Sequence, residues 1–154
     1  MSQVRVKNRS RVWPVPRPWI VSTLRTCLRL SHWSRAELSV LLTGDREIKK
    51  LNTLYRGEAR ATDCLSFPSF QRSELKRNRS VAGVVLGDIV ISSPYARKEA
   101  VRSGIGIKLE VAWLLVHSYL HLLGHDHITG RERRAMRAME ARYLERVLDR
   151  AREH

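Results

Sequence analysis

The sequence has few cysteines and no long apolar run, and each of these features excludes a class of protein. Its two cysteines, Cys27 and Cys64, lie far apart and belong to no paired motif. This excludes a disulfide scaffold and a CxxC metal site, and favours a reduced, cytoplasmic setting. The apolar run from Val111 to Val116 is far too short to span a bilayer, so no membrane association is expected. Prolines at positions 14, 16 and 18 interrupt the apolar stretch that a signal peptide would need.

Acidic residues are absent from the first 36 residues, which carry eight Arg and Lys side chains. The whole chain has a formal net charge of +14 and a pI of about 11.0. A field of this sign attracts polyanions, and nucleic acid is the commonest polyanion in a cell. Arginine far outnumbers lysine, which fits an arginine-rich proteome as well as it fits RNA binding. Charge alone therefore leaves solubility and nucleic-acid binding as open alternatives.

Length and apolar content predict one folded domain spanning residues 1–154, since 43% of the 154 residues are hydrophobic. Alternating apolar residues predict strands, and apolar residues at helical spacing predict helices. The expected strands are Val4–Lys7, Glu37–Thr43, Thr62–Phe67 and Val84–Ile91. The expected helices are Trp19–Leu30, Arg46–Tyr55, Ser92 to about Arg102, Lys108–Leu123 and Arg131 to about Arg150. The fold class predicted is α/β (α+β), with about four strands in a mixed sheet and roughly five helices.

Three local features refine this prediction. Asp45 is expected to cap the helix that begins at Arg46. The polar, basic stretch from Gln71 to Ser80 is expected to be a surface loop. Gly87 lies inside a predicted strand, which indicates a bulge or a close backbone approach.

A histidine-rich segment at the end of the long apolar helix carries the chemistry. His117 and His121 are four residues apart, so they project from the same face of a helix and can share one ion. Gly124 can end the helix in a left-handed conformation, after which His127 can approach the same point. Three histidine ligands leave one coordination position open, as in catalytic zinc sites. The segment therefore predicts one metal ion, with zinc favoured and other divalent ions allowed.

The third ligand is less firmly set than the first two. His125 competes with His127, and Asp126 can also bind a cation. The backbone directly after a glycine cap is still close to the helix axis, which favours His127 as the ligand. His125 is then expected nearby, in contact with substrate or with water on the metal.

The three histidine ligands limit the kinds of reaction that the site can catalyse. Zinc held by three neutral imidazoles lowers the pKa of a bound water to about 7, and the resulting hydroxide can attack a carbonyl or a phosphodiester. Peptidases of the HExxH type need Glu directly after the first His, but that position holds Ser118. RNA has a ribose hydroxyl that can serve as nucleophile, so a missing protein base matters less there.

Together with the segments before it, this histidine run resembles the YbeY family of endoribonucleases. The resemblance rests on three segments in the family's order: Tyr55-Arg56-Gly57 with Thr62–Pro68, Leu86–Ser92, and the H-x3-H-x5-H run from His117 to His127. The family often has Gly where this chain has Ser118, and often an aromatic residue where it has His125. A serine next to His117 is expected to hydrogen-bond water near the metal.

The resemblance implies a fold, an activity and partners. It implies a zincin-like α/β domain and a single-strand-specific, metal-dependent endoribonuclease of ribosomal RNA maturation and small-subunit quality control. The implied ligands of one zinc ion are His117, His121 and His127, and Arg56 matches an arginine that the family treats as essential. Implied partners are ribosomal RNA and the small ribosomal subunit, with ribosomal proteins or an assembly GTPase as further partners.

The catalytic residues are expected to be Arg56 and His117, and the substrate-binding residues Arg56, Ser66 and His125. A guanidinium can grip a phosphate with two hydrogen bonds, although an arginine at a helix end can also neutralise the helix dipole.

Two aspartates are weaker candidates for a role in the functional site. Asp63 is expected to hydrogen-bond at a strand end. Asp88 has two open roles, one purely structural and one in which it orients a metal-bound histidine through the second ring nitrogen.

Three functions compete on these grounds. The first is an RNA-cleaving hydrolase. The second is an RNA-binding ribosome assembly factor in which the metal stabilises the fold. The third is a hydrolase of peptides or small amides, which Ser118 and the net charge of +14 both disfavour.

Overall fold

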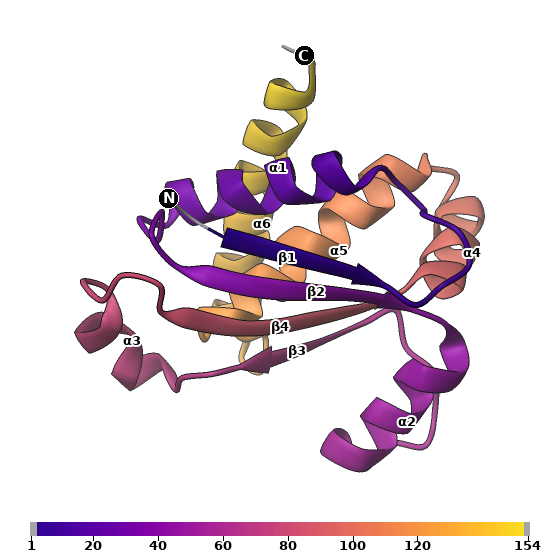
Figure 1. Ribbon diagram of the computed structural model, residues 1–154, viewed down its shortest axis with the longest axis horizontal. Coiled ribbons are helices and arrows are strands. Elements are labelled where there is room, and N and C mark those ends of the chain that lie inside the picture. Colours follow the sequence, from indigo (N-terminus) through magenta and orange to yellow (C-terminus); the bar gives the residue numbers. More distant parts are fainter. Residues whose placement is uncertain (1–2, 153–154) are drawn as a thin grey trace.

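A four-stranded sheet runs through the computed structural model, which describes residues 3–152 (Figure 1). Its strands are β1 (Gln3–Asn8), β2 (Glu37–Thr43), β3 (Cys64–Pro68) and β4 (Val85–Ser92). Their spatial order is β1-β2-β4-β3, with β1, β2 and β4 parallel and β3 antiparallel to β4. The predicted mixed sheet is confirmed. Residues 1, 2, 153 and 154 of the expected domain lie outside the described part.

Six helices accompany the sheet within residues 3–152, one more than the sequence predicted. They are α1 (Arg17–Leu30), α2 (Asp45–Arg56), α3 (Arg72–Asn78), α4 (Ser93–Ser103), α5 (Ile107–Leu122) and α6 (Gly130–Arg152). No helix in this part of the chain is long and apolar enough to cross a membrane.

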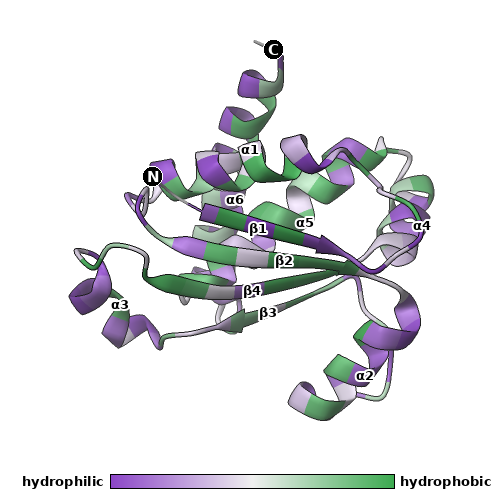
Figure 2. Cartoon of the chain, in the orientation of Figure 1, coloured by the Kyte–Doolittle hydropathy of each residue, from purple (hydrophilic) through white to green (hydrophobic). Residues whose placement is uncertain are grey.

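The helices form layers on the two faces of the sheet. On one face, α1, α5 and α6 pack together and enclose the main core (Figure 1). On the other face, α2 covers a small cluster built on Ile48, Leu65 and Val90. The strand β4 and the helix α5 are mainly hydrophobic, whereas α3 is mainly hydrophilic (Figure 2).

The buried position of α5 fixes the backbone of the histidine segment. Its apolar residues are buried on nearly every side, as its composition predicted. Leu114, Leu115 and Leu120 are each fully buried, and burial of each contributes about 1.5–3 kcal/mol. A helix held this firmly positions its side chains precisely relative to the sheet.

Two local predictions are wrong. The stretch expected to be a loop contains α3, because the backbone N–H of Gln71 donates to Glu74 Oε1 at 3.0 Å and Leu75 is buried. Asp45 does not cap α2, whose N-cap residue is Gly44. The carboxylate of Asp45 instead accepts a 2.7 Å hydrogen bond from Ser92 Oγ.

Gly87 confirms the predicted close backbone approach. Its φ is +146°, and a Cβ placed there would lie 2.3 Å from the carbonyl oxygen of Phe67 and 2.9 Å from Leu122 Cδ2. Only glycine lets β4 pass this close to β3 and to the end of α5. The helix residue in this contact, Leu122, directly follows His121 in α5.

Candidate active site

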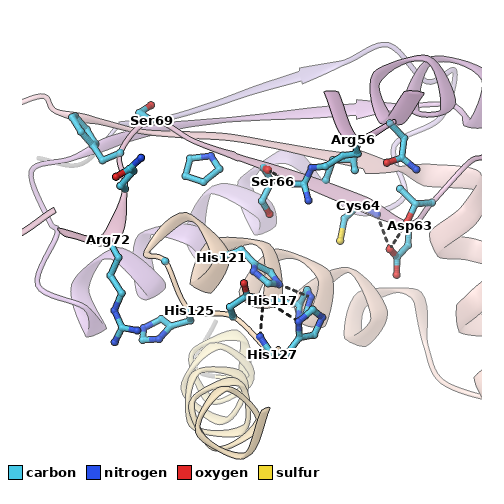
Figure 3. A pocket seen from close by; sticks show the side chains of 18 of the residues that line it. Arg56, Asp63, Cys64, Ser66, Ser69, Arg72, His117, His121, His125 and His127 are labelled. Atoms are coloured by element: carbon cyan, nitrogen blue, oxygen red, sulfur yellow. Dashed lines mark hydrogen bonds and ion pairs between the residues drawn. The ribbon is translucent and has the colours of Figure 1, made fainter. Parts of the chain in front are cut away.

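Three histidines meet at the C-terminal end of α5 (Figure 3). His117 and His121 project from α5, and their Nε2 atoms are 3.2 Å apart. His127 reaches them from the segment before α6, with its ring centroid 5.4 Å from that of His121 and 6.1 Å from that of His117. The structure thus brings together the three histidines that the sequence singled out. Their role as ligands stays a prediction.

Gly124 produces the turn that brings His127 back. Its φ is +85°, and the backbone N–H groups of Gly124 and His125 donate to the carbonyls of His121 and Leu120 at 3.0 and 3.1 Å. This is the Schellman arrangement expected at a glycine helix end. Any Cβ at this position would also lie 2.7 Å from Arg72 Cβ. The helix end therefore packs closely on α3.

Glu140 orients His117 from the opposite side, and the sequence analysis did not identify it. Its Oε1 accepts a 2.7 Å hydrogen bond from His117 Nδ1, and both side chains are largely buried. With the proton on Nδ1, the lone pair of His117 is on Nε2, the atom that faces His121. The ring also stacks on Trp113 at 4.9 Å. Hydrogen bond and stacking together fix both the tautomer and the ring plane.

Glu140 fills the orienting role that had been one alternative for Asp88. Asp88 instead accepts a hydrogen bond from Ser39 of β2, so it joins two strands. Asp63 accepts from the backbone N–H of Cys64 at 2.8 Å, which confirms its expected role at a strand end.

The histidine pair has the spacing that a zinc ion requires. Two nitrogens bound at about 2.0–2.1 Å in a tetrahedral site lie roughly 3.3 Å apart, close to the 3.2 Å between the Nε2 atoms of His117 and His121. No three His, Cys, Asp or Glu side chains among residues 3–152 already enclose one point. His127 Nδ1 instead contacts Asp126 Oδ1 at 3.1 Å. Because 57% of the His127 side chain is exposed, rotating its ring toward the pair meets little resistance.

His121 is prepared to act as a neutral ligand. Burial, followed by the neighbouring His117 and His127, lowers its pKa from 6.5 to about 4. The imidazole is therefore neutral at pH 7, so a metal would not have to compete with a second ring proton.

A cleft of about 990 Å³ opens beside the histidines, and Arg56 and Ser66 line its opposite wall (Figure 3). Arg56 comes from the last turn of α2, and its Nη2 donates to the backbone carbonyl of Ser66 at 2.7 Å. A guanidinium has five N–H donors, so this bond fixes the side chain and leaves other donors for a ligand. The cleft is bordered by all six residues that the sequence predicted for the site: Arg56, Ser66, His117, His121, His125 and His127.

Ser66 and Ser118 have structural contacts. The hydroxyl of Ser66 donates to the carbonyl of Ser118 at 3.1 Å, which joins β3 to α5. Ser118 is fully buried, so the expectation that its hydroxyl contacts water near the metal is wrong. Ser66 does line the cleft, and its contact with substrate stays a prediction.

His125 and Cys64 also line the cleft. His125 lies beside Arg72 at one end (Figure 3). Burial, and then the charge of Arg72, lowers the His125 pKa, so this ring is neutral at pH 7. Burial raises the pKa of the Cys64 thiol, which keeps it protonated and unsuited to nucleophilic attack.

Known proteins resemble this chain in sequence and in fold. The family model described as endoribonuclease YbeY matches residues 7–148. Endoribonuclease YbeY of Desulforamulus reducens is 43% identical over 112 residues, which cover 73% of this chain and 72% of the relative. The protein of the same name from Caldicellulosiruptor bescii is 40% identical over 133 residues, with coverage of 82% and 80%.

Among solved structures, the solution structure of TM1509 from Thermotoga maritima is similar in fold, with a TM-score of 0.68. Its sequence is 21% identical, and the match covers 97% of this chain and 92% of that one. The matched residues include Arg56, the strands β3 and β4, and the histidine run, so the family model contains every part of the site described above. These matches show that the chain belongs to the endoribonuclease YbeY family.

Proposed function

We propose that this protein is a metal-dependent endoribonuclease that cleaves single-stranded RNA during ribosomal RNA maturation and small-subunit quality control. His117, His121 and His127 would hold one zinc ion. The observation that carries the proposal is the 3.2 Å pair of Nε2 atoms with Arg56 across the same cleft. Family membership supports the ribonuclease activity.

Each residue of the site has a distinct task in this proposal. Arg56, fixed by the Ser66 carbonyl, grips the phosphate at the cleavage point and offsets the charge that develops there. Glu140 holds His117 in the tautomer that directs Nε2 into the cleft. A zinc ion bound there would act as a Lewis acid toward the phosphodiester.

The nucleophile comes from water or from the RNA itself. Ser118 stands where peptidases of the HExxH type have a catalytic Glu, and its full burial removes it as a base. The 2′-hydroxyl next to the scissile phosphate supplies a nucleophile that peptides and DNA lack. This difference favours RNA over a peptide or small amide.

The proposed setting is the cytoplasm, and the proposed partners are ribosomal RNA and the small ribosomal subunit. Ribosomal proteins or an assembly GTPase are further proposed partners. The net charge of +14 supports association with ribosomal RNA.

The test is cleavage of a single-stranded RNA by protein of known zinc content. His117→Ala should lose both zinc and cleavage. Arg56→Ala should keep zinc and lose roughly 10²–10³-fold in rate, the loss typical when one charge-stabilising group is removed. Arg46→Ala, on the exposed first turn of the same helix, is the matched control and should cleave like the parent. Equal cleavage by the parent and by His117→Ala would refute the proposal.

A second function, an RNA-binding assembly factor with a structural metal, predicts a different response to chelation. The core formed by α1, α5, α6 and the sheet does not include the histidine rings. We therefore expect a chelator to abolish cleavage while the protein stays folded. Tight RNA binding without turnover, together with unfolding on chelation, would favour the assembly factor.

A further inference from the structure

The cleft does not account for the positive charge of the chain. Its lining carries three arginines and four carboxylates: Arg56, Arg60, Arg72, Glu58, Asp63, Glu74 and Asp126. Against this, the chain as a whole carries +14. The surplus lies on other surfaces, where it can act on parts of an RNA that do not enter the cleft.

A second concave surface, here called the arginine groove, lies between the C-terminal halves of α1 and α6. It has a volume of about 710 Å³. Its lining residues are Thr26, Arg29, Leu30, Arg146, Asp149, Arg150 and Arg152. Four of these seven side chains are guanidinium groups. The end of α6 projects beyond α1, so the groove is open to a large partner (Figure 1).

Among residues 3–152, the charges that line the groove balance only part of this cluster. Asp149 supplies one negative charge, and its nearest ion-pair contact, to Arg152, is long at 3.9 Å. The C-terminal ends of α1 and α6 contribute about half a negative charge each. Together these offset about two of the four positive charges. If the arginines only compensated the helix dipoles, fewer than four would be enough.

We propose that the arginine groove binds the phosphate backbone of a double-stranded RNA segment that flanks the strand in the cleft. The inference rests on the proposed ribonuclease function for the choice of RNA as the polyanion. Proteins that bind single strands combine positive charge with aromatic stacking platforms. None of the described residues that line the groove is aromatic. A lining of guanidinium groups alone suits a continuous phosphate backbone better than unpaired bases.

The helix α6 connects this groove to the active site. Glu140, in the middle of α6, contacts His117, and Arg150 follows ten residues later on the same helix. At 1.5 Å per residue the two positions are about 15 Å apart along the axis. This separation is short compared with an RNA stem, so the proposal places the stem in the groove and the adjoining single strand in the cleft.

The test measures binding of a hairpin RNA with a single-stranded extension, and of the extension alone, over a range of roughly 50–200 mM salt. The variant R146Q/R150Q/R152Q removes three charges from the groove. The control R97Q/K98Q/K108Q removes three charges from exposed positions on α4 and the first turn of α5. The variant R146K/R150K/R152K retains the charge.

We expect the glutamine variant to bind the hairpin roughly tenfold or more weakly at 0.1 M salt, and its salt slope to fall by roughly 2–3, since each lost phosphate contact contributes about 0.9. Binding of the extension alone, and its cleavage, should match the parent. The lysine variant should retain most of the hairpin affinity.

Three results would overturn the proposal. The control variant could lose as much hairpin affinity as the glutamine variant, or the glutamine variant could bind the hairpin like the parent. In a parallel assay, the glutamine variant could lose binding to anionic lipid vesicles alone and keep its hairpin affinity. If the parent cleaves no RNA yet binds the hairpin through the groove, the proposed activity fails and this inference stands.

Discussion

Glu140 is the residue whose replacement tests the proposed metal site most directly. Its carboxylate accepts from His117 Nδ1 at 2.7 Å, in a place where both side chains are largely buried. Glu140→Gln keeps the size of the side chain and an oxygen acceptor but removes the charge. Glu140→Ala removes the acceptor as well, so the His117 ring loses its fixed tautomer.

The expected loss of zinc affinity follows from the role of the hydrogen bond between Glu140 and His117. Replacing a hydrogen-bond partner of a metal-bound histidine costs roughly 10–100-fold in metal affinity, or about 1.4–2.7 kcal/mol. We expect Glu140→Gln near the lower value, because an amide oxygen can still accept from Nδ1. Glu140→Ala should be near the upper value, because the buried N–H is left unpaired.

The assay is competition for zinc between the purified protein and a chelator of known affinity. Glu145→Gln provides the control, since it removes the same charge from an exposed position on the same helix. Its zinc affinity should stay within about twofold of the parent. Circular dichroism of the metal-free proteins separates loss of affinity from loss of fold. Parental zinc affinity in Glu140→Gln and Glu140→Ala, with both proteins folded, would show that this contact does not support the metal site.

Two further predictions concern stability and are measured by urea denaturation. Gly87→Ala should destabilise the protein by roughly 2–4 kcal/mol, because its Cβ would overlap the Phe67 carbonyl at a φ of +146°. Gly106→Ala, at an N-cap with open space around it, should cost no more than about 1 kcal/mol; equal costs at the two glycines would contradict this account of the strand crossing. Ser118→Ala should leave stability unchanged or raise it by up to about 1 kcal/mol, because among the described residues its buried hydroxyl makes no well-formed hydrogen bond and has only the Cys64 thiol, a weak partner, beside it. Ser92→Ala should instead cost about 1–2 kcal/mol, because Ser92 caps α4 and donates to an aspartate; a larger loss in Ser118→Ala than in Ser92→Ala would reveal a partner for Ser118.

Most of the fold could be predicted from the sequence because its signals are local. Alternation located the four strands, and helical spacing located five of the six helices of residues 3–152. The short helix α3 was missed because its polar composition outweighed the Gln71 and Glu74 capping pair. Asp45 was misread because its partner, Ser92, lies 47 residues away in sequence. Capping by Asp45 and contact with Ser92 are indistinguishable until the tertiary structure is known.

The candidate site, too, could be predicted where its signals are local and not where they depend on tertiary contacts. The spacing of His117 and His121 and the glycine turn after them are local patterns, and the structure brings the expected side chains together. Glu140 was not identified, although a signal existed. It falls on the packed face of α6, between Met136 and Tyr143 at helical spacing. A carboxylate on an otherwise apolar face needs a buried partner, and only the packing of α6 against α5 identifies that partner as His117.

The hydrogen bond from Arg56 to the Ser66 carbonyl has one more consequence. β3 is one of the two edge strands of the sheet, and the residues that flank Ser66 are the ones that exchange hydrogen bonds with β4. The backbone of Ser66 therefore points outward, where an extended polypeptide could add itself as a fifth strand. The guanidinium of Arg56 already occupies that carbonyl at 2.7 Å. The same side chain that is proposed to grip RNA thus occupies a backbone acceptor of this edge strand, at the place where an added strand or an extended peptide would have to bond.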